Sequence, residues 1–399
     1  MLTVAQARQK ILAALPAPLS ETETLPLQEC PGRVLAEPQN AGVDVPPADN
    51  SAMDGYAVDT ASLTAGEETW LPVSQRLPAG IAPQPLQPHT AARIFTGAEI
   101  PPNANAVVMQ EKCETDGEQV RLPADVAPQQ NIRLRGQDIH SGQQILAAGQ
   151  LLQPQDIGLL ASVGIAEVNV LRRLRIAVIS TGDELVNPGQ PLAPGQIYNS
   201  NRFQLSALLQ KLNMQTVDLG NIADDPASTR AALIAAAAQA DCILTTGGVS
   251  VGEEDYVKQA VADLGRLELW RLALKPGKPL AFGDVQGTPV FGLPGNPVST
   301  FVTFMIFVRP YLLQMQGLDY QEPRPEQRRI NFAVTKASFR QEYKRVRIND
   351  AGTLDAYANQ SSGVLSSIAW ANAFAVIPPD TTLAPGDEVA TLPFASLFL

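Results

Sequence analysis

Apolar and polar positions follow two patterns along this chain, short strand-like apolar runs and longer segments of helical period. From Arg172 onward, short apolar runs alternate with longer segments of helical period, which is the βα order of a parallel sheet. Asp225-Pro226 and Asn296-Pro297 are typical of a side-chain cap followed by Pro at the first helical position. A doubly wound α/β domain is predicted over 174–320. Its expected strands lie at 175–179, 215–219, 242–246 and 270–274 and around the 286–287 turn, and its helices near 200, at 225–239, from 253 and at 297–314.

The segments on either side of this domain have shorter apolar runs. Before residue 174 the chain is rich in Pro, Gly and short β-like segments, with helices expected near 4–15 and 154–163. The polar stretch 317–329 holds two prolines and is predicted to be a linker. Alternating runs beyond it predict a small β domain. The expected divisions are an N-terminal linker domain of 1–45 and 140–173, an inserted β-rich domain of 46–139, the α/β domain of 174–320 and a C-terminal β domain of 321–399.

Composition narrows the kinds of chemistry available. A chain of 399 residues is expected to form more than one domain. Its formal charge of -11 disfavours a nucleic-acid surface, and no apolar run was expected to be long enough to cross a membrane. Three cysteines without CxxC spacing and two histidines leave little for a disulfide framework, a thiolate metal site or a Ser-His-Asp relay. We therefore expect a cytoplasmic protein that uses carboxylates, Lys, Arg, hydroxyls and backbone N–H groups.

Polar residues gather after the predicted strands, where an open α/β sheet has its ligand crevice. The loops 247–252 (GGVSVG) and 294–299 (PGNPVS) each precede a helix and offer N–H groups to a phosphate. Either loop alone is better explained as a tight turn with a capped helix, but two such loops within one sheet favour ligand binding. Carboxylates of Glu184, Asp224 and Asp255 beside a phosphate favour Mg²⁺. Lys275 and Lys278 flank a Pro-Gly turn and form either an oxyanion site or an exposed basic turn.

Together, these motifs closely resemble the molybdopterin molybdotransferase family, which inserts molybdenum into molybdopterin and includes the E domain of gephyrin. The order and spacing of the matching stretches extend over most of the chain. The stretches are 49–57 (DNSAMDGYA), 94–97 (IFTG), 135–138 (RGQD), 180–184 (STGDE), 246–252 (TGGVSVG), 275–279 (KPGKP) and 293–297 (LPGNP).

The resemblance implies a fold and a reaction. The fold class is multidomain α/β plus β: a doubly wound molybdopterin-binding α/β domain with β-rich N-terminal modules and a C-terminal β-barrel-like domain, in an elongated homodimer. The reaction converts adenylylated molybdopterin and molybdate, with Mg²⁺, into molybdenum cofactor and AMP. The molybdopterin adenylyltransferase and acceptor molybdoenzymes are candidate protein partners.

The resemblance also assigns roles to residues of this chain. Catalytic roles fall on Asp54, Thr96, Asp138, Glu184, Asp255, Lys275 and Lys278. Substrate-binding roles fall on Asp183, Gly247, Gly248, Ser250, Pro294, Gly295, Asn296, Pro297, Arg345 and Ser362, and metal-binding roles on Glu184, Asp224 and Asp255. For the oxyanion-contacting pair, Arg347 and Ser361 compete with Arg345 and Ser362.

Two other functions remain as alternatives. The adenylyltransferase that makes adenylylated molybdopterin resembles only residues 174–320, and it would not need the N-terminal motifs. A scaffold that kept the fold only to bind partners would not need charged residues such as Asp54, Glu184 and Lys275 at strand ends. The sequence therefore favours the insertase, with Asp54, Thr96 and Asp138 reaching the α/β site of a second copy.

Overall fold

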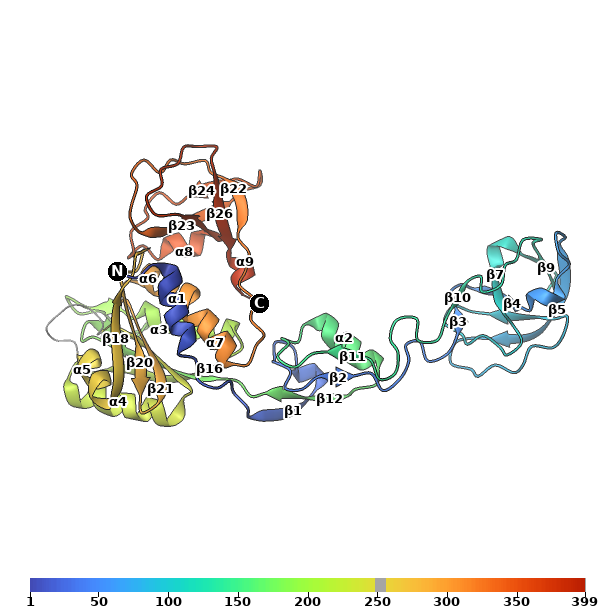
Figure 1. Ribbon diagram of the computed structural model, residues 1–399, viewed down its shortest axis with the longest axis horizontal. Coiled ribbons are helices and arrows are strands. Elements are labelled where there is room, and N and C mark those ends of the chain that lie inside the picture. The colour runs from blue at the N-terminus through green and yellow to red at the C-terminus, as the bar shows by residue number, and fades with distance from the viewer. Residues whose placement is uncertain (248–255, 399) are drawn as a thin grey trace.

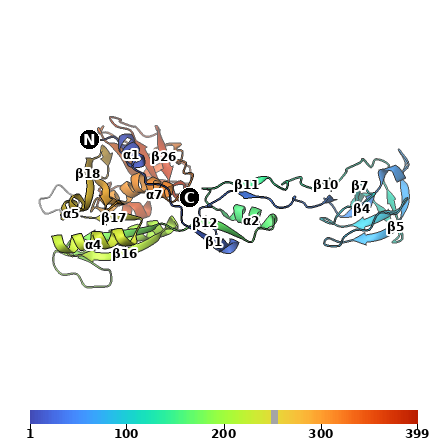
Figure 2. The ribbon, with the colours of Figure 1, turned by 60° about the horizontal axis from the view of Figure 1, so that its bottom comes forward.

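The computed structural model describes residues 1–247 and 256–398 and shows an elongated chain (Figure 1). An α/β domain lies at one end with the C-terminal β domain against it, a small module around α2 lies in the middle, and a β module lies at the far end. Two chain segments run side by side between the middle and far modules in both views (Figure 2). The far module is therefore an insertion, since the chain enters and leaves it through these segments.

The α/β domain is built on a six-stranded sheet in the order β16-β13-β17-β21-β20-β18. Neighbouring strands are parallel from β16 to β21, whereas β20 runs antiparallel to both β21 and β18. The parallel order expected from the sequence is confirmed, with an antiparallel edge added by the hairpin at 286–287. The strands are β13 (Arg175–Thr181), β16 (Gln215–Ile222), β17 (Cys242–Thr246), β18 (Gly265–Arg271), β20 (Pro279–Val285) and β21 (Thr288–Leu293).

Helices cover both faces of this sheet because successive side chains of a strand point to opposite sides. Ile176 and Val178 of β13 belong to one hydrophobic core, and Ala177 and Ile179 belong to another. The helices on the first face are α1 (Val4–Ala13), α3 (Ser200–Lys211) and the continuous α6 (Pro297–Thr303), η4 (Phe304–Val308) and α7 (Arg309–Met315). Those on the second face are α4 (Pro226–Gln239) and α5 (Tyr256–Leu264).

The two expected helix caps differ in outcome. Asp225 accepts a hydrogen bond from the Ser228 N–H at 2.9 Å and caps α4, as predicted. Asn296 precedes α6, but its side chain makes no cap bond. Instead, Asn296 acts through its backbone carbonyl, which accepts from Thr300 N and Oγ1. The prediction of a side-chain cap was therefore wrong at Asn296, because the hydroxyl of Thr300 holds this turn from inside the helix.

Two other expectations need correction. Helix α1 was assigned to the N-terminal linker domain, but its Val4, Ala7 and Ile11 pack in the α/β core. The helix Pro297–Met315 is long and apolar enough to span a membrane by composition, contrary to the expectation that no such run exists. Because 94% of that apolar stretch is buried inside the protein, it is the core helix of the α/β domain.

The middle and far modules are β-rich. In the middle module, β1 pairs with β12 and β2 with β11, and α2 packs against β11. The far module contains a six-stranded sheet in the order β7-β4-β6-β5-β9-β8. The middle elements are β1 (Thr22–Pro26), η1 (Leu27–Glu29), β2 (Gln39–Asn40), β11 (Gln144–Leu146), α2 (Pro154–Ser162) and β12 (Glu167–Leu171). The far elements are β3 (Asn50–Ser51), β4 (Gly55–Val58), η2 (Thr60–Ser62), β5 (Thr69–Leu77), β6 (Ala91–Ile94), β7 (Ala106–Met109), η3 (Gln110–Lys112), β8 (Glu114–Thr115), β9 (Gln119–Leu122) and β10 (Ile132–Arg133).

The C-terminal sheet follows the order β19-β23-β25-β26-β22, with β24 beside β23. A bridge between Ile330 and Leu354 joins the chain after β22 to β24, so the sheet closes into a barrel-like ring. The strand β22 begins at Glu326, where the sequence predicted a linker to 329. The elements are β19 (Leu274–Lys275), β22 (Glu326–Arg329), β23 (Gln341–Ile348), β24 (Leu354–Ala356), α8 (Ser366–Trp370), β25 (Ala373–Ile377), β26 (Glu388–Pro393) and α9 (Phe394–Leu397).

Candidate functional site

A cavity of about 1020 Å³ opens at the carboxyl ends of β13, β17 and β21, where the C-terminal domain meets the α/β domain. Thr181, Thr246 and Pro294 mark these three strand ends on its wall. This is the position at which an open α/β sheet binds ligands. The opposite wall comes from the C-terminal domain, through Arg340 and the loop 360–363.

The two loops predicted to hold phosphate lie on this cavity as far as the structure describes them. Gly247 has a φ of +86°, and an added Cβ would lie 2.7 Å from the Thr181 carbonyl oxygen, so the close approach of β13 and β17 requires glycine. Gly248 and Ser250 lie outside the described residues. Pro294, Gly295, Asn296 and Pro297 all line the cavity. Their loop is held by Thr300 Oγ1, which donates to the Pro294 carbonyl, and by Asn201 Nδ2, which donates to the Gly295 carbonyl at 2.7 Å.

Lys275 and Lys278 both line the cavity. Between them, Gly277 has a φ of +109° that a tight turn can use only with glycine at low cost. Lys275 is half-buried, and its Nζ lies 3.1 Å from Oε2 of Glu342 on β23. Lys278 is exposed at the same wall. The turn thus places two ammonium groups on one side of the cavity, and a carboxylate from another domain holds one of them.

Arg345 and Ser362 occupy different positions relative to the cavity. Ser361 and Ser362 both line it, whereas Arg345 is 1% exposed behind them. The Arg345 guanidinium donates to the Ser361 carbonyl and to Ser367 Oγ, each at 3.1 Å, and burial lowers its pKa to about 10. Arg345 therefore supports the serine loop from below in this structure. The competing Arg347 donates to the Trp370 carbonyl and lies over the Trp370 ring.

Sequence reasoning missed three residues that line the cavity. Arg340 lies before β23, and its Nε is buried without a hydrogen-bond partner in the described part of the chain. Asn201 Oδ1 on α3 is likewise buried without a described partner. Tyr198 is 45% exposed, and its hydroxyl donates to the Gln190 carbonyl. The sequence pattern points only to residues that directly follow a strand of the α/β sheet. Asn201 lies on a helix, Tyr198 lies on a short strand that protrudes from the domain, and Arg340 lies on a loop of the C-terminal domain.

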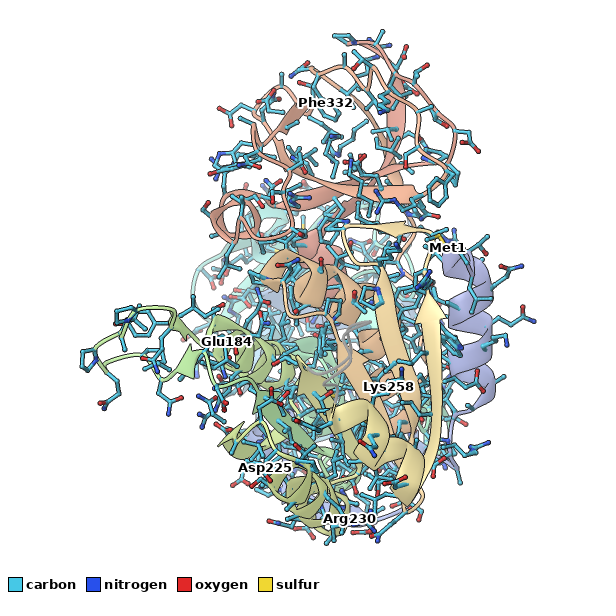
Figure 3. All side chains as sticks on the ribbon, turned by 90° about the vertical axis from the view of Figure 1, so that its left-hand side faces the viewer. Met1, Glu184, Asp225, Arg230, Lys258 and Phe332 are labelled. Atoms are coloured by element: carbon cyan, nitrogen blue, oxygen red, sulfur yellow. The ribbon has the colours of Figure 1, made fainter. Side chains whose placement is uncertain are left out.

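The carboxylates proposed for metal binding are only partly gathered. Glu184 lines the cavity, at the base of the segment that projects from the α/β domain in Figure 3. Asp183 Oδ1 accepts from the Asp224 N–H at 3.3 Å, which joins the segments that follow β13 and β16, but neither residue is among the described residues that line the cavity. Asp255 lies outside the described residues. Across 1–247 and 256–398, no group of three His, Cys, Asp or Glu side chains is placed to hold a metal.

The inserted module holds its own polar pair far from this cavity. Asp54 precedes β4 and Thr96 follows β6, and the antiparallel pairing of these strands places them side by side. Asp54 Oδ1 accepts from the Thr96 N–H at 2.7 Å and from Thr96 Oγ1 at 2.8 Å, which lowers the pKa of Asp54. Asp138 is exposed on the connecting segment, where its N–H donates to the Val45 carbonyl at 3.0 Å. In Figure 1 the middle module around α2 lies between β4 of the inserted module and the α/β domain, to which Lys275 belongs.

Three family models match successive parts of this chain, in the same order as its domains. "MoeA N-terminal region (domain I and II)" matches residues 2–164, "Probable molybdopterin binding domain" matches 177–314, and "MoeA C-terminal region (domain IV)" matches 327–394. A molybdopterin molybdenumtransferase of Haemophilus influenzae is 41% identical over the whole length of both chains. The chain belongs to the MoeA family of molybdopterin molybdenumtransferases.

Other relatives agree with this membership. Molybdopterin molybdenumtransferase 2 of Mycobacterium tuberculosis is 40% identical over 90% of this chain and 91% of its own. The crystal structure of the molybdopterin biosynthesis MoeA protein of Pyrococcus horikoshii aligns with a TM-score of 0.85 at 31% identity, covering 98% of this chain and all of that one. The MoeA-family membership identifies the chain as a transferase of molybdenum cofactor biosynthesis that acts on molybdopterin.

Proposed function

We propose that this chain inserts molybdenum from molybdate into adenylylated molybdopterin and releases AMP. The observation that carries the proposal is the joint placement of Lys275, Lys278 and Arg340 on one cavity, in a chain of formal charge -11. Local cations amid a surplus of carboxylates are expected where an anion must be bound. Molybdate is a tetrahedral dianion, so two ammonium groups and a guanidinium match both its charge and its hydrogen-bond acceptors.

The remaining walls suit the organic part of the substrate. A volume of about 1020 Å³ is at the upper end of small-molecule sites, as a molecule with a pterin and an adenylate requires. The loops at Gly247 and 294–297 offer backbone N–H groups for phosphate. Tyr198 and Ile197 add an exposed aromatic ring and an aliphatic side chain to the rim, against which a planar pterin can stack.

The proposed reaction needs no cysteine from the protein. The two sulfur atoms of the dithiolate become ligands of molybdenum, and a displaced oxide leaves with two protons as water. Water also cleaves the phosphoanhydride, which yields AMP and the phosphate of molybdopterin. The residues of this chain hold the oxyanion against the dithiolate and orient the phosphates. Ligand exchange at molybdenum and hydrolysis of the phosphoanhydride therefore occur between groups that are already in position.

Magnesium fits the carboxylates beside the cavity. Mg²⁺ usually takes one or two protein carboxylates together with substrate phosphates, rather than a cage of protein ligands. Glu184 lines the cavity and the Asp224 N–H is bonded to Asp183, the neighbour of Glu184 in the chain. Both are hard oxygen donors, and we propose that they hold the ion with Asp255. When bound, Mg²⁺ would neutralise charge that develops on the phosphates during cleavage. The protein residues alone would still position molybdate.

A second copy would complete the site. Asp54 and Thr96 adjoin β4 and β6 at the far end of an elongated protomer, and Asp138 lies on the connecting segment, so one chain does not bring them to Lys275. A two-fold homodimer would place the inserted module of each copy against the cavity of its partner. We also propose that the dimer works in the cytoplasm, where the adenylyltransferase and the acceptor molybdoenzymes would be its protein partners.

The test is to incubate the purified chain with adenylylated molybdopterin, molybdate and Mg²⁺ and to measure AMP and active cofactor. The insertase should release AMP in a molybdate-dependent manner and yield cofactor that activates an apo-molybdoenzyme. An adenylyltransferase would instead consume ATP and molybdopterin. A scaffold would do neither, and either of these two results would contradict the proposal.

A further inference from the structure

Glu342 is a buried carboxylate at the edge of the cavity that the proposed reaction does not use. Its side chain is 7% exposed and lies between two ammonium groups. Lys275 Nζ is 3.1 Å from Oε2, and Lys344 Nζ is 3.3 Å from Oε1. A buried carboxylate is tolerated when cations compensate it, and here two cations face one anion. The three side chains together keep one net positive charge.

The backbone reinforces this contact between domains. The short strand β19 leaves the α/β sheet and pairs in parallel with β23 of the C-terminal sheet. In that register Lys275 is the direct partner of Glu342, and the Gln341 N–H donates to the Ala273 carbonyl at 2.9 Å. The backbone of Lys275 is therefore positioned by the strand pair, and the end of its side chain is positioned by the carboxylate.

We infer that Glu342 is a positioning residue, which holds the Lys275 ammonium at the cavity wall before the oxyanion arrives. A free lysine side chain loses rotamer entropy when it is fixed. If Glu342 has already restricted it, less is lost when the anion binds, so affinity rises. Glu342 does not line the cavity among the described residues, so it acts through Lys275 rather than on the ligand. The inference rests on the proposed function in taking molybdate as that oxyanion.

The direction of the change in molybdate affinity distinguishes the positioning role of Glu342 from the opposite role, in which its charge repels the anion. A carboxylate close to an anion site also weakens the positive potential there, and if that effect dominated, removing Glu342 would improve molybdate binding. The positioning role predicts weaker binding. Lys344, the second cation on the carboxylate, is 15% exposed and also lies over the Phe332 ring, so it is not freed to replace Lys275.

The experiment measures AMP release by the full-length chain across a molybdate titration. Glu342→Ala should raise the KM for molybdate about tenfold while kcat stays within about twofold, because a contact that orders a ligand group is lost. Glu342→Gln keeps an oxygen that can accept from Lys275, so its KM should lie between those of wild type and Glu342→Ala.

Asp241→Asn is the matched control. Asp241 is a half-buried carboxylate paired with Arg172 at 2.7 Å, at the start of β17 and so at the opposite end of the sheet from the cavity. Its loss should lower thermal stability without changing the KM for molybdate. If Asp241→Asn raises that KM as much as Glu342→Ala does, the effect is general destabilisation and the inference is overturned. A lower KM in Glu342→Ala overturns it as well.

A second measurement does not depend on the reaction. Brief acetylation followed by mass spectrometry compares the labelling rate of Lys275 with that of exposed Lys278 in the same molecule. Glu342→Ala should speed labelling of Lys275 severalfold relative to Lys278, and equal ratios in variant and wild type would refute the positioning role. If wild type releases no AMP, the proposed function fails, and the labelling ratio still decides whether Glu342 holds Lys275.

Discussion

The cavity of the α/β domain and the Asp54–Thr96 pair of the inserted module are built in different ways. The cavity takes its charged groups from segments far apart in the chain and from two domains, as Lys275 and Arg340 illustrate. Asp54 and Thr96 come from the ends of two neighbouring strands, and two hydrogen bonds hold them together. One region offers space and positive charge, whereas the other offers a carboxylate ordered by hydrogen bonds. This complementarity supports a shared site between two copies.

The largest expected effect comes from a complementation experiment, which tests whether the two regions act from different subunits. Asp54→Ala and Lys275→Ala proteins should each lose on the order of a hundredfold in AMP release, since each lacks a charged group of the proposed site. After subunit exchange of equal amounts, half of the dimers are mixed and each contains one intact composite site. Activity should then return to about a quarter of wild type. No recovery after verified exchange would place both residues in one protomer's site.

The next effect concerns only the cavity. Lys275→Gln should weaken molybdate binding roughly tenfold to hundredfold, which corresponds to about 1.5–3 kcal/mol for a charge-assisted contact. Because the Pro-Gly turn holds the backbone, thermal stability should change little, and high molybdate should partly restore activity. AMP release measured across a molybdate titration gives the result. Superimposable curves for variant and wild type would identify 275–278 as a merely exposed basic turn.

A smaller effect is expected at the rim of the cavity. Tyr198→Ala should weaken binding of the pterin by about 1 kcal/mol, close to fivefold, because an aromatic stacking surface is lost. Tyr198→Phe keeps the ring and removes only the bond to the Gln190 carbonyl, so it is the matched control. Quenching of pterin fluorescence on titration with protein measures the affinity. Equal losses in both variants would show that the hydroxyl, and not the ring, matters.

The smallest effect tests the hydrogen bonds between Thr96 and Asp54 in the inserted module. The pKa of Asp54 is lowered first by the Thr96 N–H and second by the Thr96 hydroxyl, so Thr96→Val should raise that pKa towards its ordinary value. A lowered pKa in the folded state contributes stability above the unfolded pKa, and this contribution is lost as the pH falls through the folded pKa. NMR titration of the Asp54 carboxyl carbon should show the upward shift, with Thr90→Val, a half-buried position of the same module, as the control. An unchanged titration would mean that the hydroxyl bond is not formed in solution.

Much of the α/β domain could be predicted from local pattern. The strand 242–246 coincides with β17, the Asp225 cap begins α4, and Lys275 and Lys278 lie on the cavity at the strand ends. These features depend on period, on capping and on the rule that parallel strands end at one edge. The β-rich modules were also predicted from short β-like segments, and the resemblance to a family added the barrel-like closure of the C-terminal sheet.

Contacts between segments that are distant in the sequence could not be predicted from the local pattern. Helix α1 is amphipathic in sequence, but nothing local indicates that it packs on a core formed mainly by residues after 174. The role of Arg345 was taken from a motif, whereas its burial behind the serine loop depends on how β23 and 360–363 fold together. Arg340 lies on the cavity only because two domains meet there, and Asn201 lies on it because α3 packs beside the Gly295 loop.

The sequence by itself determined the sheet, the turn with its two lysines, the membership of the MoeA family and the residue types available for chemistry. Each of these follows from neighbours in the chain, since backbone period, caps and turns are local interactions. Only the tertiary structure decided that Glu342 holds Lys275 and that Arg345 supports Ser361. Those contacts depend on the docking of separate domains, where burial and charge pairing are set by partners that sequence distance does not reveal.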